Sequence, residues 1–151
     1  MTAVVSGPKT GRALVPTGLF TKLAQRVATD ERVDKNHADR VVDQTLAFLG
    51  TCAVSDLVLA PSAAVDPGWH AFILHTQEYA AFCSLVGGRF LHHVPTDDAD
   101  PTLHGAAARA VIERTVAEIR RARFEVDEDL WKPSVVDCSQ CYQGCSDSPR
   151  P

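Results

Sequence analysis

The sequence predicts a small all-α protein, a bundle of about four helices with a flexible N-terminal arm and an irregular, cysteine-rich C-terminal tail. Three observations lead to this fold class. Apolar residues recur at spacings of three and four through the middle of the chain. No segment of useful length alternates apolar and polar residues as a strand does. Glycine, proline and cysteine gather at the two ends, so we expect an arm over 1–16, a helical domain over 17–133 and a tail over 134–151.

The composition is typical of a soluble globular protein. Of 151 residues, 45% are hydrophobic and 23% are charged, which suits one domain with a real core. The net charge of -4 argues against a nucleic-acid binder that depends on bulk positive charge. No apolar run approaches the roughly 18 residues of a transmembrane helix, and the N-terminus lacks the apolar stretch of a secretory signal. We therefore expect a cytoplasmic protein that binds neither nucleic acid nor a membrane.

The first two helices follow from their apolar stripes. Thr17 is a plausible N-cap for the first helix, and the polar stretch 28–36 separates it from the second. Each stripe repeats every three or four residues, which places its members on one face. The first contains Leu19, Phe20, Leu23, Ala24 and Val27, and the second contains Ala38, Val41, Val42, Thr45, Leu46, Leu49 and Cys52.

A third helix is expected over residues 66–88. Asp66 and Pro67 suit the N-cap and first helical positions, and the Gly87–Gly88 pair suits the C-terminal end. Ser62 is placed to cap the segment after the break at Pro61. A loop bounded by Pro95 and Pro101 comes next.

The last long helix is expected from Thr102 to about Phe124, followed by one turn that packs Leu130 and Trp131 onto the bundle. The one basic cluster lies near the end of this helix, where cations interact well with the helix dipole. A phosphate site is the alternative interpretation of this cluster, which contains Arg120, Arg121 and Arg123.

The tail contains three of the five cysteines, at positions 138, 141 and 145. Cys138 and Cys141 have the C-x2-C spacing of a zinc knuckle, and Cys145 adds a third thiolate after Gly144. A histidine would complete a Cys3His site. The alternatives are an iron–sulfur cluster and free or modified thiols, because thiols of a cytoplasmic protein stay reduced.

The histidines supply the candidate fourth ligand. His92 and His93 are adjacent in a segment expected to be extended, so one should face inward and the other outward. Asp66 and His70 lie four residues apart and share a helix face, so the carboxylate can orient a metal-bound imidazole. The predicted metal ligands are therefore Cys138, Cys141, Cys145, His93, His92 and His70.

Other polar and sulfur-bearing residues have a simpler interpretation. Cys52, Cys83 and Tyr79 fall on apolar stripes and are expected in the core, with the Tyr79 hydroxyl bound to one partner. His75 is expected to be partly buried and hydrogen-bonded. His37 and His104, at predicted helix starts, are expected on the surface.

Residues 65–95 resemble the signature of the glycine-rich domain-containing protein-like family. The matching positions include a W-H pair, a tyrosine, a cysteine and the His-His-x-Pro segment, and the whole chain with its tail resembles short actinobacterial members. The chain lacks the glycine-rich run that names the family. The resemblance implies a helical domain and no established activity, and it favours a polar or metal site between the 66–70 helix start and the 92–93 loop. The matching residues are Asp66, Trp69, His70, Leu74, His75, Tyr79, Cys83, His92, His93 and Pro95.

Three functions are consistent with these patterns. The first is a small metal-binding protein with structural zinc and an accessory or protein-interaction role, bound to a protein partner that the sequence does not identify. The second is a metal-dependent enzyme that uses Asp66, His70 and one of the paired histidines, His93 or His92, with Tyr79 or Glu78 as acid or base. The third is a precursor peptide whose cysteine-rich C-terminus is modified by a partner enzyme.

Overall fold

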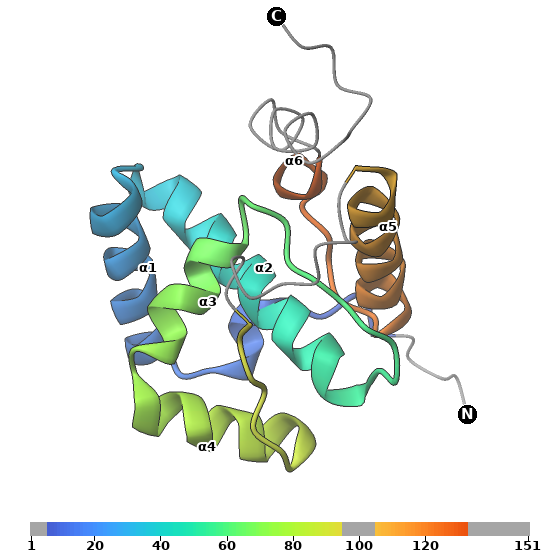
Figure 1. The fold of residues 1–151 in the computed structure, drawn as a ribbon. Coiled ribbons are helices and arrows are strands. Elements are labelled where there is room, and N and C mark those ends of the chain that lie inside the picture. Colours follow the sequence, from blue (N-terminus) through green and yellow to red (C-terminus); the bar gives the residue numbers. More distant parts are fainter. Residues whose placement is uncertain (1–5, 95–104, 133–151) are drawn as a thin grey trace, which may run out of the picture.

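The computed structural model describes residues 6–94 and 105–132, and for these it confirms the all-α class (Figure 1). A bundle of four helices is not confirmed, because six α-helices and one 3-10 helix form within those ranges. No strand forms there, and an isolated bridge joins Lys9 to Phe124. The elements are η1 (Gly11–Leu14), α1 (Thr17–Glu31), α2 (Lys35–Val54), α3 (Asp66–Ile73), α4 (Thr76–Gly87), α5 (Ala106–Arg121) and α6 (Glu128–Trp131). None of these helices combines the length and the apolarity that crossing a membrane requires.

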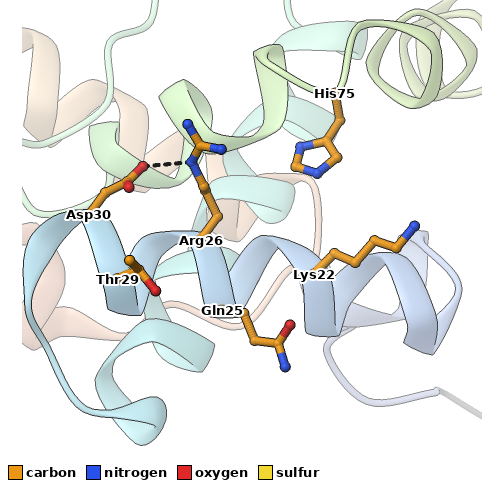
Figure 2. A pocket seen from close by; sticks show the side chains of 6 residues that line it. All are labelled: Lys22, Gln25, Arg26, Thr29, Asp30 and His75. Carbon is orange, nitrogen blue, oxygen red and sulfur yellow. Dashed lines mark hydrogen bonds and ion pairs between the residues drawn. The ribbon is translucent and has the colours of Figure 1, made fainter.

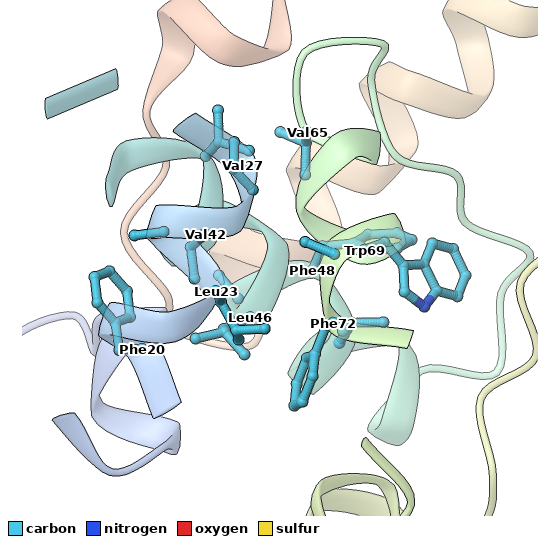
Figure 3. Packing of buried hydrophobic residues seen from close by; sticks show 14 of the residues in the cluster. Phe20, Leu23, Val27, Val42, Leu46, Phe48, Val65, Trp69 and Phe72 are labelled. Atoms are coloured by element: carbon cyan, nitrogen blue, oxygen red, sulfur yellow. The ribbon is translucent and has the colours of Figure 1, made fainter. Parts of the chain in front are cut away.

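Helix α2 lies at the centre of the fold, with α1, α3 and α4 on one side and α5 on the other (Figure 1). Asp34 caps its start by accepting a hydrogen bond from the backbone N–H of His37 at 2.7 Å. Its apolar stripe is buried against α1 and α3, as Figure 3 shows for Val42, Leu46 and Phe48. The predicted stripe is therefore confirmed, although Cys52 at its end is only half-buried.

Helix α3 approaches α2 very closely at Gly68. A Cβ atom on Gly68 would lie 2.0 Å from Thr45 Oγ1, so no larger residue fits there without movement. The Thr45 hydroxyl lies within hydrogen-bonding distance of two carbonyl oxygens, that of Val41 at 2.8 Å and that of Val65 at 3.0 Å. This buried contact positions the start of α3, and with it the side chains of Asp66 and His70.

The helix expected over 66–88 is interrupted at His75 and forms two helices. The backbone of His75 leaves the helical region, with φ -88° and ψ 69°, and its N–H bonds to Phe72 rather than to Ala71. The His75 ring Nδ1 lies 3.0 Å from the Ala71 carbonyl oxygen and replaces the missing backbone donor. The predicted end is confirmed, because Gly88 adopts the left-handed conformation after α4.

Part of the segment expected as an arm is held against the domain. Lys9 exchanges backbone hydrogen bonds with Arg123 and Glu125, and the 3-10 helix η1 contacts α2. Gly11 is buried where a Cβ would lie 1.9 Å from the Asp43 carbonyl oxygen, and the Arg12 backbone N–H donates to Asp43 Oδ1 at 2.8 Å. The sequence pattern missed this because a close backbone contact requires glycine and leaves no periodic signal.

The last helices follow the expected order. Helix α5 begins at Ala106, after Gly105 with φ 59°, and the expected start at Thr102 lies outside the described residues. Arg120 and Arg121 occupy its last turn, as predicted, and Arg120 pairs with Glu128. The expected turn after it forms as α6, with Leu130 and Trp131 buried. The tail from residue 133 onward lies outside the described residues.

Gln44 joins α6 to the buried face of α2. Its side-chain oxygen accepts hydrogen bonds from Trp131 Nε1 at 2.8 Å and from the Asp127 backbone N–H at 3.0 Å. Its Nε2 donates to the Glu125 carbonyl oxygen at 3.0 Å. One buried amide thus satisfies three polar groups of the segment that precedes and forms α6.

Replacing Gln44 by alanine should lower the free energy of unfolding by about 2–4 kcal/mol, because Trp131 Nε1–H and two backbone groups would lose their partners. Chemical denaturation followed by circular dichroism measures this. The matched control is Gln25→Ala on the exposed face of α1, expected within about 0.5 kcal/mol of the wild type. Equal effects of the two substitutions would contradict the role of Gln44.

Arg40 and Asp127 form a second connection between α2 and the α6 segment, through two hydrogen bonds of 2.6 and 2.9 Å. The hydrogen bonds from Arg40 hold the pKa of Asp127 below its ordinary value of 3.8. Because this pKa is depressed in the folded state, the stabilisation is present above the unfolded-state pKa and is lost as pH falls through the folded-state value.

The Asp127→Asn variant should therefore be less stable than the wild type at pH 7, with a difference that narrows as pH falls below 3.8. Denaturation curves at several pH values test this. Asp30→Asn, which removes an exposed ion pair with Arg26, should change stability by less than about 1 kcal/mol. A difference between Asp127→Asn and the wild type that persists unchanged at the lowest pH would contradict this account.

Candidate metal centre

Asp66 and His70 meet on one face of α3. Asp66 is the first residue of the helix and His70 follows one turn later, so the helical repeat brings the two side chains together. His70 Nε2 lies 3.0 Å from Asp66 Oδ2. The predicted pair is therefore present, and the position of the carboxylate at the helix N-terminus suits its negative charge.

His93 reaches the same carboxylate from the segment after α4. Its Nε2 lies 2.9 Å from Asp66 Oδ1 and 3.0 Å from His70 Nε2. Asp66, His70 and His93, hereafter the triad, are the one group in the described residues whose donor atoms are arranged to hold a metal ion. These are the residues of the enzyme hypothesis, with His93 as the chosen member of the histidine pair.

The triad lies at the edge of the core. The exposed fractions of the side chains are 13% for His93, 24% for Asp66 and 57% for His70. The ring of buried Trp69 packs edge-on against His93, with 4.5 Å between ring centroids. One side of the site is thus closed by an indole ring, and His70 leaves the other side open to solvent.

The three close contacts of the triad cannot all be hydrogen bonds. Each Nε2 atom carries at most one proton and directs it to one partner. If both nitrogens are protonated, the two carboxylate contacts are hydrogen bonds and the nitrogen–nitrogen contact is not. If only one is protonated, the lone pair of the other faces a carboxylate oxygen. A cation between the donors would accept a lone pair from each residue, so the donor set fits a metal ion.

A buried chain of hydrogen bonds holds the segment that contains His93. Trp69 Nε1 donates to the Tyr79 hydroxyl oxygen at 2.8 Å, and the Tyr79 hydroxyl donates to the carbonyl oxygen of Leu91. Tyr79 is inaccessible to solvent, and burial raises its pKa. Its proton therefore stays on the hydroxyl, and Tyr79 is better suited to positioning this segment than to acting as the acid or base of the enzyme hypothesis.

The histidine pair divides as its alternation predicted. His93 points to Asp66, whereas His92 is exposed and packs against Phe90 with ring centroids 4.9 Å apart. His92 is thus absent from the triad. Among the remaining histidines, His75 is half-buried and bonded to Ala71, as expected, and His37 is half-buried at the start of α2 rather than on the surface.

Of the two cysteines expected in the core, one is fully buried and the other is not. Cys83 is buried, as expected, whereas Cys52 is half-buried, and burial of its thiol raises its pKa to about 12. Cys138, Cys141 and Cys145 lie outside the described residues, as does His104, so the Cys3His site stays a prediction. Asp66 contacts both His70 and His93, the combination that the enzyme hypothesis named, whereas its interpretation as an orienting partner accounts only for the contact with His70.

Two surface hollows lie away from the triad. One, of about 360 Å³, is lined by five residues of α1 and by His75, whose ring points towards α1 (Figure 2). Its positive charge is partly neutralised, because Arg26 pairs with Asp30 within it. The other, of about 350 Å³, lies between the ends of α2 and α5 and includes Leu57 and Glu118. Neither hollow contains a triad residue.

Comparison with known proteins places the chain in a family. Residues 12–112, about two thirds of the 151, match the UCP032817-like family, and this range includes the whole triad but excludes the tail cysteines. No curated protein and no solved structure matches the chain. The family match does not test the resemblance to the glycine-rich domain-containing protein-like family, which stays a prediction. By the extent of the match, the chain belongs to the UCP032817-like family.

Proposed function

We propose that this protein binds one divalent metal ion through Asp66, His70 and His93, and that the ion fastens the segment 89–94 to α3. The observation that carries the proposal is the triangle of donor atoms, with contacts of 2.9–3.0 Å that no protonation state satisfies together. Asp66 and His70 lie on α3, whereas His93 follows α4 in the chain. An ion bound by all three would therefore join two separate segments and increase the free energy of unfolding.

Zinc is the first ion to test. Two imidazole nitrogens and one carboxylate oxygen form a donor set that Zn²⁺ accepts. An iron–sulfur cluster takes mainly thiolate ligands and so belongs only to the hypothesis for the tail. The Cys138, Cys141 and Cys145 thiolates are proposed as a second, sulfur-rich site.

The proposed role is structural or accessory, with recognition of a protein partner. Support comes from three exposed apolar side chains at the C-terminal end of α2 and just after it. They are Val54, Leu57 and Val58, with exposed fractions of 69%, 48% and 72%. A metal-dependent enzyme is the second candidate. It is favoured by the exposure of His70, which leaves room for ligands other than protein at the ion. The precursor-peptide hypothesis concerns the tail alone.

Protein purified without a histidine tag should bind about one Zn²⁺ per chain at the triad, measured by equilibrium dialysis and elemental analysis. Replacing His93 by alanine should weaken binding by more than about 100-fold, because losing even a residue that orients a ligand costs about 10–100-fold. His92→Ala is the matched control, since His92 is adjacent in sequence and lies outside the triad.

A triple variant of Cys138, Cys141 and Cys145 to serine separates the two sites. It should keep the ion at the triad and lose any second ion bound by the tail. Zinc binding that survives His93→Ala and disappears in the triple variant would contradict the triad as the site and return the ion to the tail.

Tyr79→Phe should weaken zinc binding although Tyr79 does not contact the proposed ion. Loss of the hydroxyl leaves the Leu91 carbonyl and Trp69 Nε1–H unpaired, which should lower stability by about 1–3 kcal/mol. It should also weaken zinc binding about tenfold, because the segment that contains His93 loses its anchor. The control is Phe82→Leu, a buried α4 substitution without this hydrogen bond, which should lower stability but leave the zinc dissociation constant unchanged. Unchanged zinc affinity in Tyr79→Phe would limit Tyr79 to a structural role.

A further inference from the structure

The distance between the two triad nitrogens carries information about the coordination geometry of the ion. His70 Nε2 and His93 Nε2 are 3.0 Å apart. Two nitrogens each about 2.1 Å from one ion subtend about 90° at that distance, whereas a tetrahedral angle would separate them by about 3.4 Å. The spacing therefore favours the right angles of a six-coordinate ion over a four-coordinate structural zinc site.

The carboxylate supports the same geometry. Asp66 Oδ1 faces His93 and Oδ2 faces His70, at 2.9 and 3.0 Å, so either oxygen or both can complete a group of adjacent positions around the ion. Two histidines and one carboxylate on one face, with the remaining positions open, form the ligand set of non-haem ferrous sites. Catalytic zinc takes the same donor set, so the angle implied by the nitrogen–nitrogen spacing, rather than the type of donor atom, distinguishes the two ions.

The open positions have a way to solvent. Trp69 packs against the half-closed His93 side of the site, and His70 is 57% exposed at its rim. With the three side chains on one face and the carboxylate bound through one oxygen, a six-coordinate ion keeps three adjacent positions for exchangeable ligands. Adjacent positions suit a small molecule that binds through two oxygen atoms at once.

We propose that the triad holds a six-coordinate ion of the ferrous class on one face and leaves neighbouring positions for a small ligand with two oxygen donors. This rests on the proposed function, since the triad must first bind a metal. It changes the expected role of the ion from a closed structural centre to one that exchanges ligands. The tail thiolates then have no part in the coordination of this ion.

Cobalt(II) replaces either ion and reports its geometry by visible absorption. The proposal expects the weak absorption of six-coordinate cobalt in the full chain, and a shift of these bands on titration with oxalate, which binds through two oxygens. Serine at all three tail positions, Cys138, Cys141 and Cys145, should leave the spectrum unchanged. His70→Ala, at the most exposed ligand and so least harmful to folding, should abolish the bands, and His92→Ala should keep them.

A second measurement uses the ferrous protein itself. Nitric oxide added to it under anaerobic conditions should give the electron paramagnetic resonance signal of a ferrous nitrosyl centre, which requires an open position, and oxalate should perturb that signal. Intense blue four-coordinate cobalt, or near-ultraviolet charge-transfer bands from a cysteine thiolate, would overturn the inference and leave the triad a metal site. Absence of any cobalt, iron or zinc binding at the triad would overturn the proposed function as well.

Discussion

The burial of α2 is the constraint on which the rest of the structure depends. Eleven of its residues, between Ala38 and Thr51, are shielded from solvent, and η1, α1, α3, α4 and α5 all pack against it. A helix enclosed on so many sides must satisfy its polar residues within the fold. Thr45 does so against the start of α3, and Gln44 does so against the segment that leads into α6. The same helix therefore positions both α3, which contains Asp66 and His70, and the C-terminal end of the described chain.

Two structural features around α2 bring the triad residues together. The close approach at Gly68 sets α3 and with it the pair of Asp66 and His70. The break at His75 then turns the chain, so that α4 carries the next segment back towards α3. Tyr79 bonds to this segment at Leu91, two residues before His93, while the Trp69 ring packs on His93 itself. The site is thus supported by buried hydrogen bonds and aromatic contacts that keep its donor atoms close together.

The metal chemistry that the fold allows depends on which ligand atoms it brings together. The cysteine spacing of the tail predicts a zinc knuckle, with an iron–sulfur cluster or free or modified thiols as alternatives. The donors that the fold brings together are instead nitrogen and oxygen atoms at a half-exposed edge. A metal ion there would join two segments and still contact solvent. These two properties would suit either a structural ion or an ion with an exchangeable ligand, and the coordination geometry distinguishes the two proposals.

The sequence by itself determined the features that depend on short spacing. Helical stripes, the Gly88 helix end, the Asp66–His70 pair and the opposite directions of His92 and His93 all follow from the backbone repeat. It did not predict the interruption at His75, the packing of Gly11, the role of Gln44, or which histidine meets Asp66. The contact between Asp66 and His93 spans 27 residues. Only the tertiary structure determines this contact, because it depends on how α3 and α4 pack on α2. A pattern of neighbouring residues in the sequence does not contain that information.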